Sequence, residues 1–198
     1  MPDGPAARPS PIPCFDEEVR PHPVVVGTLV GASFGLVFVL VNAGPLPATT
    51  AWRTLGVLAS AAVVVLLLRL RVPRPPQPAR GAARVYALSV AAEVVAIPLG
   101  ARVLGALDRS DLVLPWVVLV VGVHFWPFAR AFHAPVFRWL AVALVATALA
   151  GGAAVLADVP EAGPASGVAA GFVLVLGVGA ALVVGARTPA QPGPGSAS

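Results

Sequence analysis

Two ionisable side chains stand deep inside long apolar stretches of the sequence, where a charge is costly. Glu93 lies in RVYALSVAAEVVAIPLGARVLGAL, and His124 lies in LVLPWVVLVVGVHFWPFAR. A carboxyl group and an imidazole can exchange a proton or hold each other through a polar contact. Ionisable groups at membrane depth face other helices, pair with one another and mark ion or proton pathways. Glu93 and His124 are therefore the candidates for an intramembrane polar site.

The depth of these two residues predicts that they contact each other. Glu93 is nine residues, or about 13 Å of helix rise, from Arg84, and His124 is six residues, or about 9 Å, from Arg130. If the two stretches are antiparallel neighbours, both side chains reach a similar level. Arg102 is not the expected partner, because nine residues at about 100° each place it on the helix face opposite Glu93.

Two prolines accompany the candidate pair. Pro98 removes the hydrogen bond that the Val94 carbonyl would accept, and Pro127 does the same to Val123. A freed carbonyl at membrane depth needs a donor or water, so kinks here would suit a polar cavity, a proton relay or a hinge. The other interpretation is structural, because a polar contact between membrane helices stabilises packing by about 0.6 kcal/mol. Both interpretations remain open from the sequence.

Signatures of catalysis and of cofactor binding are absent from the sequence. It contains no G-x-S-x-G, H-E-x-x-H, GxxxxGK[ST] or C-x-x-C pattern. The three histidines, His22, His124 and His133, lack the spacing of metal ligands. The sequence therefore predicts a protein that is not an enzyme and that holds no cofactor and no metal.

The elements that carry these residues are six apolar stretches. The chain is 58% hydrophobic and 11% charged, with a mean hydropathy of +0.88. About 20 mainly apolar residues are enough to cross the roughly 30 Å of hydrocarbon in a bilayer. The sequence therefore predicts an all-α fold, an integral membrane bundle of six transmembrane helices. The expected spans are 24–43, 51–70, 85–107, 112–130, 136–157 and 165–186.

The chain divides into one membrane domain and two tails. Residues 1–22 and 188–198 are rich in proline and lack apolar runs, which predicts disordered tails. Residues 23–187 form the expected transmembrane domain. The lipid bilayer is then the main partner of the protein.

The basic residues predict the orientation of this domain. All thirteen are arginines at or near the ends of apolar stretches, so they indicate topology rather than a nucleic-acid surface. With both termini inside, only Arg53, Arg102 and Arg109 lie outside, and Trp52 and Trp116 are expected at the outer interface of the membrane. The lysine-free composition, rich in Ala, Val, Arg and Pro, indicates a GC-rich bacterial genome, so we expect a bacterial inner membrane with cytoplasmic termini. The ten inner residues are Arg8, Arg20, Arg69, Arg71, Arg74, Arg80, Arg84, Arg130, Arg138 and Arg187.

Glycines repeat at every fourth position in two of the stretches. Such small residues share one helix face and let backbones approach closely. The alternative is a glycine-lined conduit. A homo-oligomer or a partner membrane subunit is compatible with such faces. The glycines are Gly27, Gly31 and Gly35 in the first stretch and Gly163, Gly167 and Gly171 in the sixth.

The segment GVHFWPFARAFHAPVFRW, residues 122–139, combines aromatic, basic and proline residues. Its aromatic residues, among them Trp126 and Trp139, are expected to anchor helix ends at the lipid headgroups. Arg130 and Arg138 are candidates for contact with anionic headgroups. Its pattern G-x-H-F-x-P-x-A resembles a family of small polytopic bacterial membrane proteins of uncharacterised function, and this resemblance implies no activity.

Two functional hypotheses follow from the sequence, and a third is an enzyme acting on lipid, which a phosphate-sized pocket lined by Arg130 and Arg138 would favour. The first is a small transport or permeation protein with its polar site at Glu93 and His124. The alternative is a non-catalytic membrane scaffold or accessory subunit in which the same pair only fixes helix packing. A titratable pair in a hydrated cavity would favour the first, and a dry, mutually satisfied pair would favour the second.

Overall fold

The computed structural model describes residues 23–70 and 80–187, which form six α-helices and one short 3-10 turn without any strand. This confirms the predicted all-α class, and all six helices are long and apolar enough to cross a membrane. They agree with the predicted spans within about three residues at each end. The tails expected at 1–22 and 188–198 lie outside the described residues. The elements are α1 (Pro23–Asn42), α2 (Thr49–Arg69), α3 (Ala82–Ala106), η1 (Ser110–Leu112), α4 (Val113–Ala131), α5 (Pro135–Leu156) and α6 (Ala162–Arg187).

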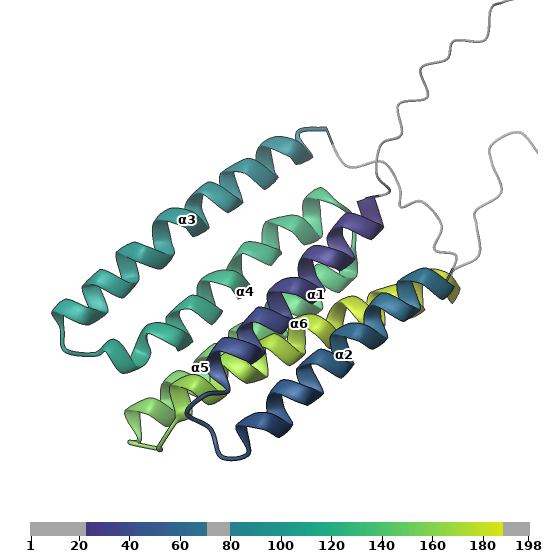
Figure 1. The fold of residues 1–198 in the computed structure, drawn as a ribbon. Coiled ribbons are helices and arrows are strands. Elements are labelled where there is room, and N and C mark those ends of the chain that lie inside the picture. Colours follow the sequence, from purple (N-terminus) through teal and green to yellow (C-terminus); the bar gives the residue numbers. More distant parts are fainter. Residues whose placement is uncertain (1–22, 71–79, 188–198) are drawn as a thin grey trace, which may run out of the picture.

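Successive helices run in opposite directions, and α6 lies at the centre (Figure 1). It packs on α1, α2, α4 and α5, whereas α3 lies at the edge and packs on α4 and the η1 turn. Because six helices alternate in direction, the first described residue of α1 and the last of α6 lie at the same end of the bundle (Figure 1). We call this the arginine-rich end, because in the described chain it carries Arg69, Arg80, Arg84, Arg130, Arg138 and Arg187.

The closest helix contact joins α1 to α6 through glycines. A Cβ built on Gly35 would lie 2.7 Å from the Gly171 carbonyl oxygen, and a Cβ built on Gly171 would lie 2.6 Å from the Gly35 oxygen. Only glycine permits this separation, in which the backbones themselves touch. Gly31 extends the contact against the Val178 side chain, and Gly167 extends it against Asn42.

Two of the predicted packing glycines are placed differently. Gly163 faces the Asp111 carbonyl of η1, 3.1 Å from where its Cβ would be, rather than α1. Gly27 has nothing within 4 Å and is exposed, so its assignment to a packing face was wrong. Eight residues are not a whole number of helical turns, so Gly27 lies about 80° around the helix from Gly35. The buried residue at that level of α1 is its neighbour Thr28.

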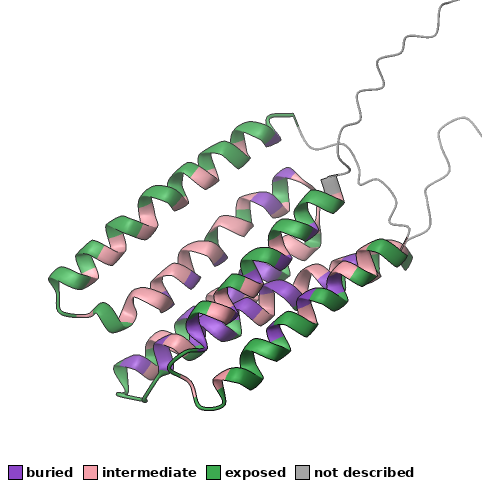
Figure 2. Cartoon of the chain, in the orientation of Figure 1, coloured by how far each residue is buried: buried purple, intermediate pink, exposed green. Residues whose placement is uncertain are grey.

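Glycines also allow close packing of α2, α4 and α5, which with α1 and α6 form what we call the central group. Gly56 in α2 leaves room for Val39 of α1, and Gly122 in α4 leaves room for Leu144 of α5. Large apolar side chains such as Phe34 point outward instead, as expected where lipid replaces water. Figure 2 shows buried positions gathered on the helices around α6, whereas α3 is exposed or half-buried along almost all of its length. In α3 only Ala82 is buried.

Replacing Gly35 tests this packing. We expect Gly35→Ala to lower the free energy of unfolding by about 1–3 kcal/mol, because the added methyl group must displace backbone atoms of α6. Gly27→Ala, in the same helix, is the matched control, and it should leave stability unchanged or raise it by up to about 1 kcal/mol. Unfolding in detergent measures both variants. Equal stabilities would contradict the glycine contact.

Candidate functional site

Glu93 of α3 and His124 of α4 meet between their helices. The Nδ1 atom of His124 lies 2.7 Å from Oε2 of Glu93, and their side chains are 16% and 20% exposed, respectively. Nδ1 has no aligned hydrogen-bond partner among the described residues, so the two groups form a close polar contact, which is an ion pair only when the imidazole carries a proton on both nitrogens. The pair lies at the α3–α4 contact and not in the glycine-packed centre of the bundle.

The helices that hold the pair continue through both nearby prolines. Pro98 stands inside α3, and Pro127 stands inside α4. The turn before α3 uses Gly81 at φ 85°, a left-handed conformation that suits glycine. At the other end of α3, a turn through η1 reverses the chain into α4. This short connection fixes the antiparallel register that brings Glu93 opposite His124.

Aromatic rings surround the imidazole on the side of the arginine-rich end. The His124 ring stacks on Phe125 with centroids 4.5 Å apart, and it meets the edge of Phe128 at 4.9 Å. Phe128 also stacks on Tyr86 of α3 at 5.5 Å, and Phe125 stacks on Phe137 of α5 at 5.9 Å. Such apolar surroundings strengthen a charge contact by excluding water. With Phe132, the residues Tyr86, Phe125, Phe128 and Phe137 form what we call the aromatic cluster.

The phenylalanines of residues 122–139 were expected to anchor helix ends at the headgroups, and this was wrong for the cluster. Phe128 is only 6% exposed, and Phe125, Phe132 and Phe137 are half-buried. The reason is the tight turn between α4 and α5, which brings the rings of both helices onto one another before they can reach lipid. The two tryptophans differ, since Trp126 is 45% and Trp139 66% exposed.

A second polar contact joins α3 to α4, and the sequence analysis missed it. The Trp116 indole Nε1–H donates a hydrogen bond to the Ala96 carbonyl at 3.1 Å. The indole occupies the space beside Gly100, where any Cβ would overlap it. Trp116 had been expected only at a membrane interface. The available signal was Gly100 itself, which is seven residues after Glu93 and thus on the same face of α3.

The remaining predicted site residues lie on the surface. Arg130, at the end of α4, and Arg138, in the first turns of α5, are exposed. Arg102 is exposed as well, away from the α3 face that carries Glu93. In the described part of the chain, no three His, Cys, Asp or Glu side chains are grouped so that they could hold a metal ion.

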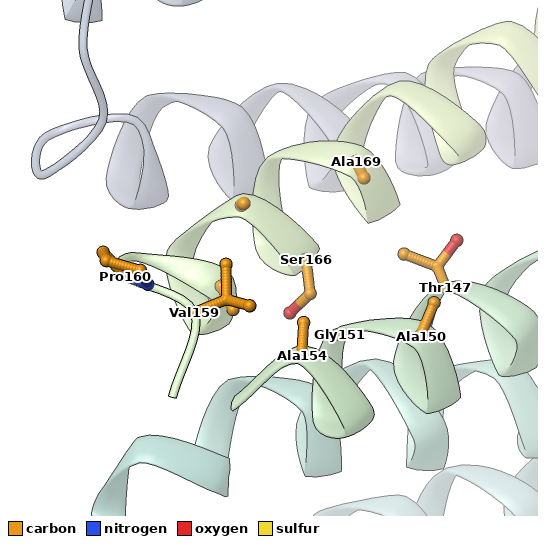
Figure 3. Close-up of a pocket in the computed structure, with 10 residues that line it drawn as sticks. Thr147, Ala150, Gly151, Ala154, Val159, Pro160, Ser166 and Ala169 are labelled. Carbon is orange, nitrogen blue, oxygen red and sulfur yellow. The ribbon is translucent and has the colours of Figure 1, made fainter. Parts of the chain in front are cut away.

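A shallow groove of about 420 Å³ lies between α5 and α6, toward the end opposite the arginine-rich end (Figure 3). Its lining contains no ionisable side chain. Its hydroxyl groups serve their own helices, since Ser166 Oγ donates to the Gly163 carbonyl at 2.7 Å and Thr147 Oγ1 to the Ala143 carbonyl at 2.8 Å. The groove is therefore separate from the Glu93–His124 pair. Its lining residues are Thr147, Ala150, Gly151, Ala154, Val159, Pro160, Ala162, Ala165, Ser166 and Ala169.

Comparison with known proteins adds no relative, because no protein-family model, curated protein or solved structure matches this chain. The six apolar helices themselves identify a multi-pass membrane protein, in which an ionisable pair joins a peripheral helix to the rest of the bundle.

Replacing Gly100 tests the tryptophan contact. We expect Gly100→Ala to displace the Trp116 indole, to break its hydrogen bond to Ala96 and to lower the free energy of unfolding by about 1–3 kcal/mol. Gly105→Ala in the same helix is the control, because its Cβ would meet only Ser110 Oγ at 3.9 Å. Thermal unfolding in detergent measures both. A Gly100→Ala protein as stable as the control would contradict this packing.

Proposed function

We propose that the protein is a small proton-responsive transport or permeation protein, with Glu93 and His124 as its ionisable site. The observation that carries this proposal is the 2.7 Å contact of a carboxyl group and an imidazole inside two spanning helices. Such groups are costly in hydrocarbon and belong, as a rule, to ion or proton pathways. A carboxyl group and an imidazole can each take up and release a proton, so the pair has the chemistry of a proton pathway.

The position of the pair supports a moving part rather than a fixed core. In the central group, helices touch through glycines and small residues, which leaves them little freedom. Helix α3 packs mainly on α4 and η1, and its side-chain contacts with α4 include those of Tyr86, Glu93 and the Ala96 carbonyl. A change in the charge of Glu93 or His124 alters one of these contacts. We infer that protonation shifts α3 relative to α4.

A scaffold or accessory subunit is the second candidate. It is favoured by the apolar aromatic rings around the pair, because a dry pair is what a structural role predicts. The same contact also holds a peripheral helix on its neighbour. Such contacts average about 0.6 kcal/mol in membranes. In both cases we infer that the protein is not an enzyme, since neither the pair nor the α5–α6 groove presents an activated nucleophile.

We also propose that the arginine-rich end faces the cytoplasm of a bacterial inner membrane. In the described chain this end carries six arginines and no acid, whereas the opposite end carries three arginines and four acids. Two of those three are locally compensated: Arg53 Nε donates to the Leu40 carbonyl at 3.2 Å, and Arg109 pairs with Asp111 at 3.1 Å. Arginine excess marks the cytoplasmic side.

A reporter fused after Arg187 should read cytoplasmic, and an external reading would reverse the assignment.

Proton flux into vesicles tests the function. Liposomes of phosphatidylethanolamine and phosphatidylglycerol carry a trapped pH-sensitive dye, and a pH gradient is imposed. The wild-type protein should dissipate the gradient faster than empty vesicles. Glu93→Gln removes the titration but keeps polar atoms, so it should return the rate to that of empty vesicles. Glu161→Gln, in the exposed turn before α6, is the control and should keep the wild-type rate.

Two results would decide against transport. A wild-type rate equal to that of empty vesicles would contradict proton permeation. A Glu93→Gln protein with the full wild-type rate would show that titration of the pair is not needed, which leaves the pair with a structural role.

A further inference from the structure

We propose that water reaches the Glu93–His124 pair from the arginine-rich end alone, along a route that the Ser89 hydroxyl lines and the Tyr86 ring closes. This inference rests on the proposed role of the pair in proton movement. It adds the side of the membrane from which a proton enters and the two residues that control its entry.

Ser89 and Tyr86 lie on the face of α3 that carries Glu93. They precede Glu93 by four and seven residues, which places them about 40° and about 20° from it around the helix. Ser89 is half-buried, whereas Leu88 and Ala91 beside it are exposed, so Ser89 faces α4. Helical side chains lean toward the helix N-terminus, which in α3 is the arginine-rich end. The Glu93 carboxyl group therefore lies over the turn that contains Ser89.

The Ser89 hydroxyl is available to water. It has no hydrogen-bond partner among the described residues. A hydroxyl group can donate one hydrogen bond and accept two, so it can hold a water molecule beside the Glu93 carboxyl group.

The same face of α3 is apolar on the other side of Glu93. The Trp116 indole fills the space beside Gly100, and its N–H is already donated to the Ala96 carbonyl. Water therefore meets no free polar side chain on this part of the face. The half-buried residues there are Ala96, Ile97, Gly100, Ala101 and Leu104.

The Tyr86 ring closes the route on the arginine-rich side. It stacks on Phe128 of α4 with centroids 5.5 Å apart, and Phe128 meets the edge of the His124 ring at 4.9 Å. Phe128 is 6% exposed, whereas Tyr86 is 52% exposed, so Tyr86 is the outer member of the stack. Exposed side chains change rotamer readily. Rotation of Tyr86 away from Phe128 would uncover the turn that holds Ser89.

Cysteine labelling tests the proposal without requiring proton flux, so its result is independent of the flux experiment. Cys14→Ser removes the one cysteine of the sequence, and Ser89→Cys or Ala96→Cys then introduces another. Both positions are half-buried and share one face of α3, on either side of Glu93. Proteoliposomes receive the water-soluble reagent methanethiosulfonate ethyltrimethylammonium on both sides of the membrane. Mass spectrometry then measures the modified fraction over time.

The Ser89→Cys protein should be modified, whereas the Ala96→Cys protein should stay unmodified over the same period. Adding Tyr86→Ala should raise the Ser89→Cys rate by about two- to tenfold, the range expected for the loss of one aromatic contact. Tyr86→Phe keeps the ring and is the matched control, so it should leave the rate unchanged. An Ala96→Cys protein that stays unmodified with Tyr86→Ala verifies that the bundle remains folded.

Four outcomes would overturn the proposal. Equal modification of the two cysteine variants would show that the pair is not reached from one side alone. Modification of Ala96→Cys alone would place the entry at the opposite end. A Ser89→Cys protein that stays unmodified even with Tyr86→Ala would exclude this water route. A Ser89→Cys rate that Tyr86→Ala does not change would exclude Tyr86 as the closing residue.

Discussion

The backbone contact between Gly35 and Gly171 is the interaction around which the rest of the bundle is arranged. Within a membrane, lipid tails are as apolar as leucine, so burial of apolar side chains does not drive helices together. Close packing must do so instead. The α1–α6 contact makes α6 the central helix, against which α2, α4 and α5 also pack. Gly56 allows the same close approach between α2 and α1, and Gly122 allows it between α4 and α5.

Helix α3 is held on the bundle by side-chain contacts rather than by glycine packing. It has no glycine contact between backbones, and its Gly100 accommodates the Trp116 indole instead. Its contacts with α4 combine the ring stack of Tyr86, the charge contact of Glu93 and the hydrogen bond accepted by the Ala96 carbonyl. Of these contacts, the one between Glu93 and His124 depends on the charges of its two groups, whereas glycine packing does not. This difference is why we assign the proton-responsive motion to α3 and a fixed framework to the other five helices.

Hydropathy alone was enough to predict the six helices and their ends. The pairing of Glu93 with His124 followed from their matched depth in consecutive antiparallel helices, and the two side chains do lie 2.7 Å apart. Both predictions use properties that can be read along the chain. The helices follow from runs of apolar residues, and the matched depth follows from counting residues to the helix ends. The sequence does not determine the functional role of the pair, which stays a prediction.

The sequence does not show which faces of the helices contact each other. The glycine repeats indicated close packing, but a step of four residues turns about 40° past one full helical turn, so Gly27 lies off the face on which Gly35 touches α6. The phenylalanines of residues 122–139 were assigned to the interface by their position near a helix end. The tight turn between α4 and α5 turned them toward each other. Trp116 was assigned in the same way, while its partner lies on α3.

The Glu93–His124 contact is expected to hold α3 on α4, and a double-mutant cycle measures whether it does. Unfolding free energies are measured in detergent for the wild type, Glu93→Ala, His124→Ala and the double variant. Each single change leaves the other group without its partner, so the double variant should lose less than the sum of the two. We expect a coupling of about 0.6 kcal/mol, and at most about 1.7 kcal/mol. Losses that add within about 0.3 kcal/mol would contradict the claim.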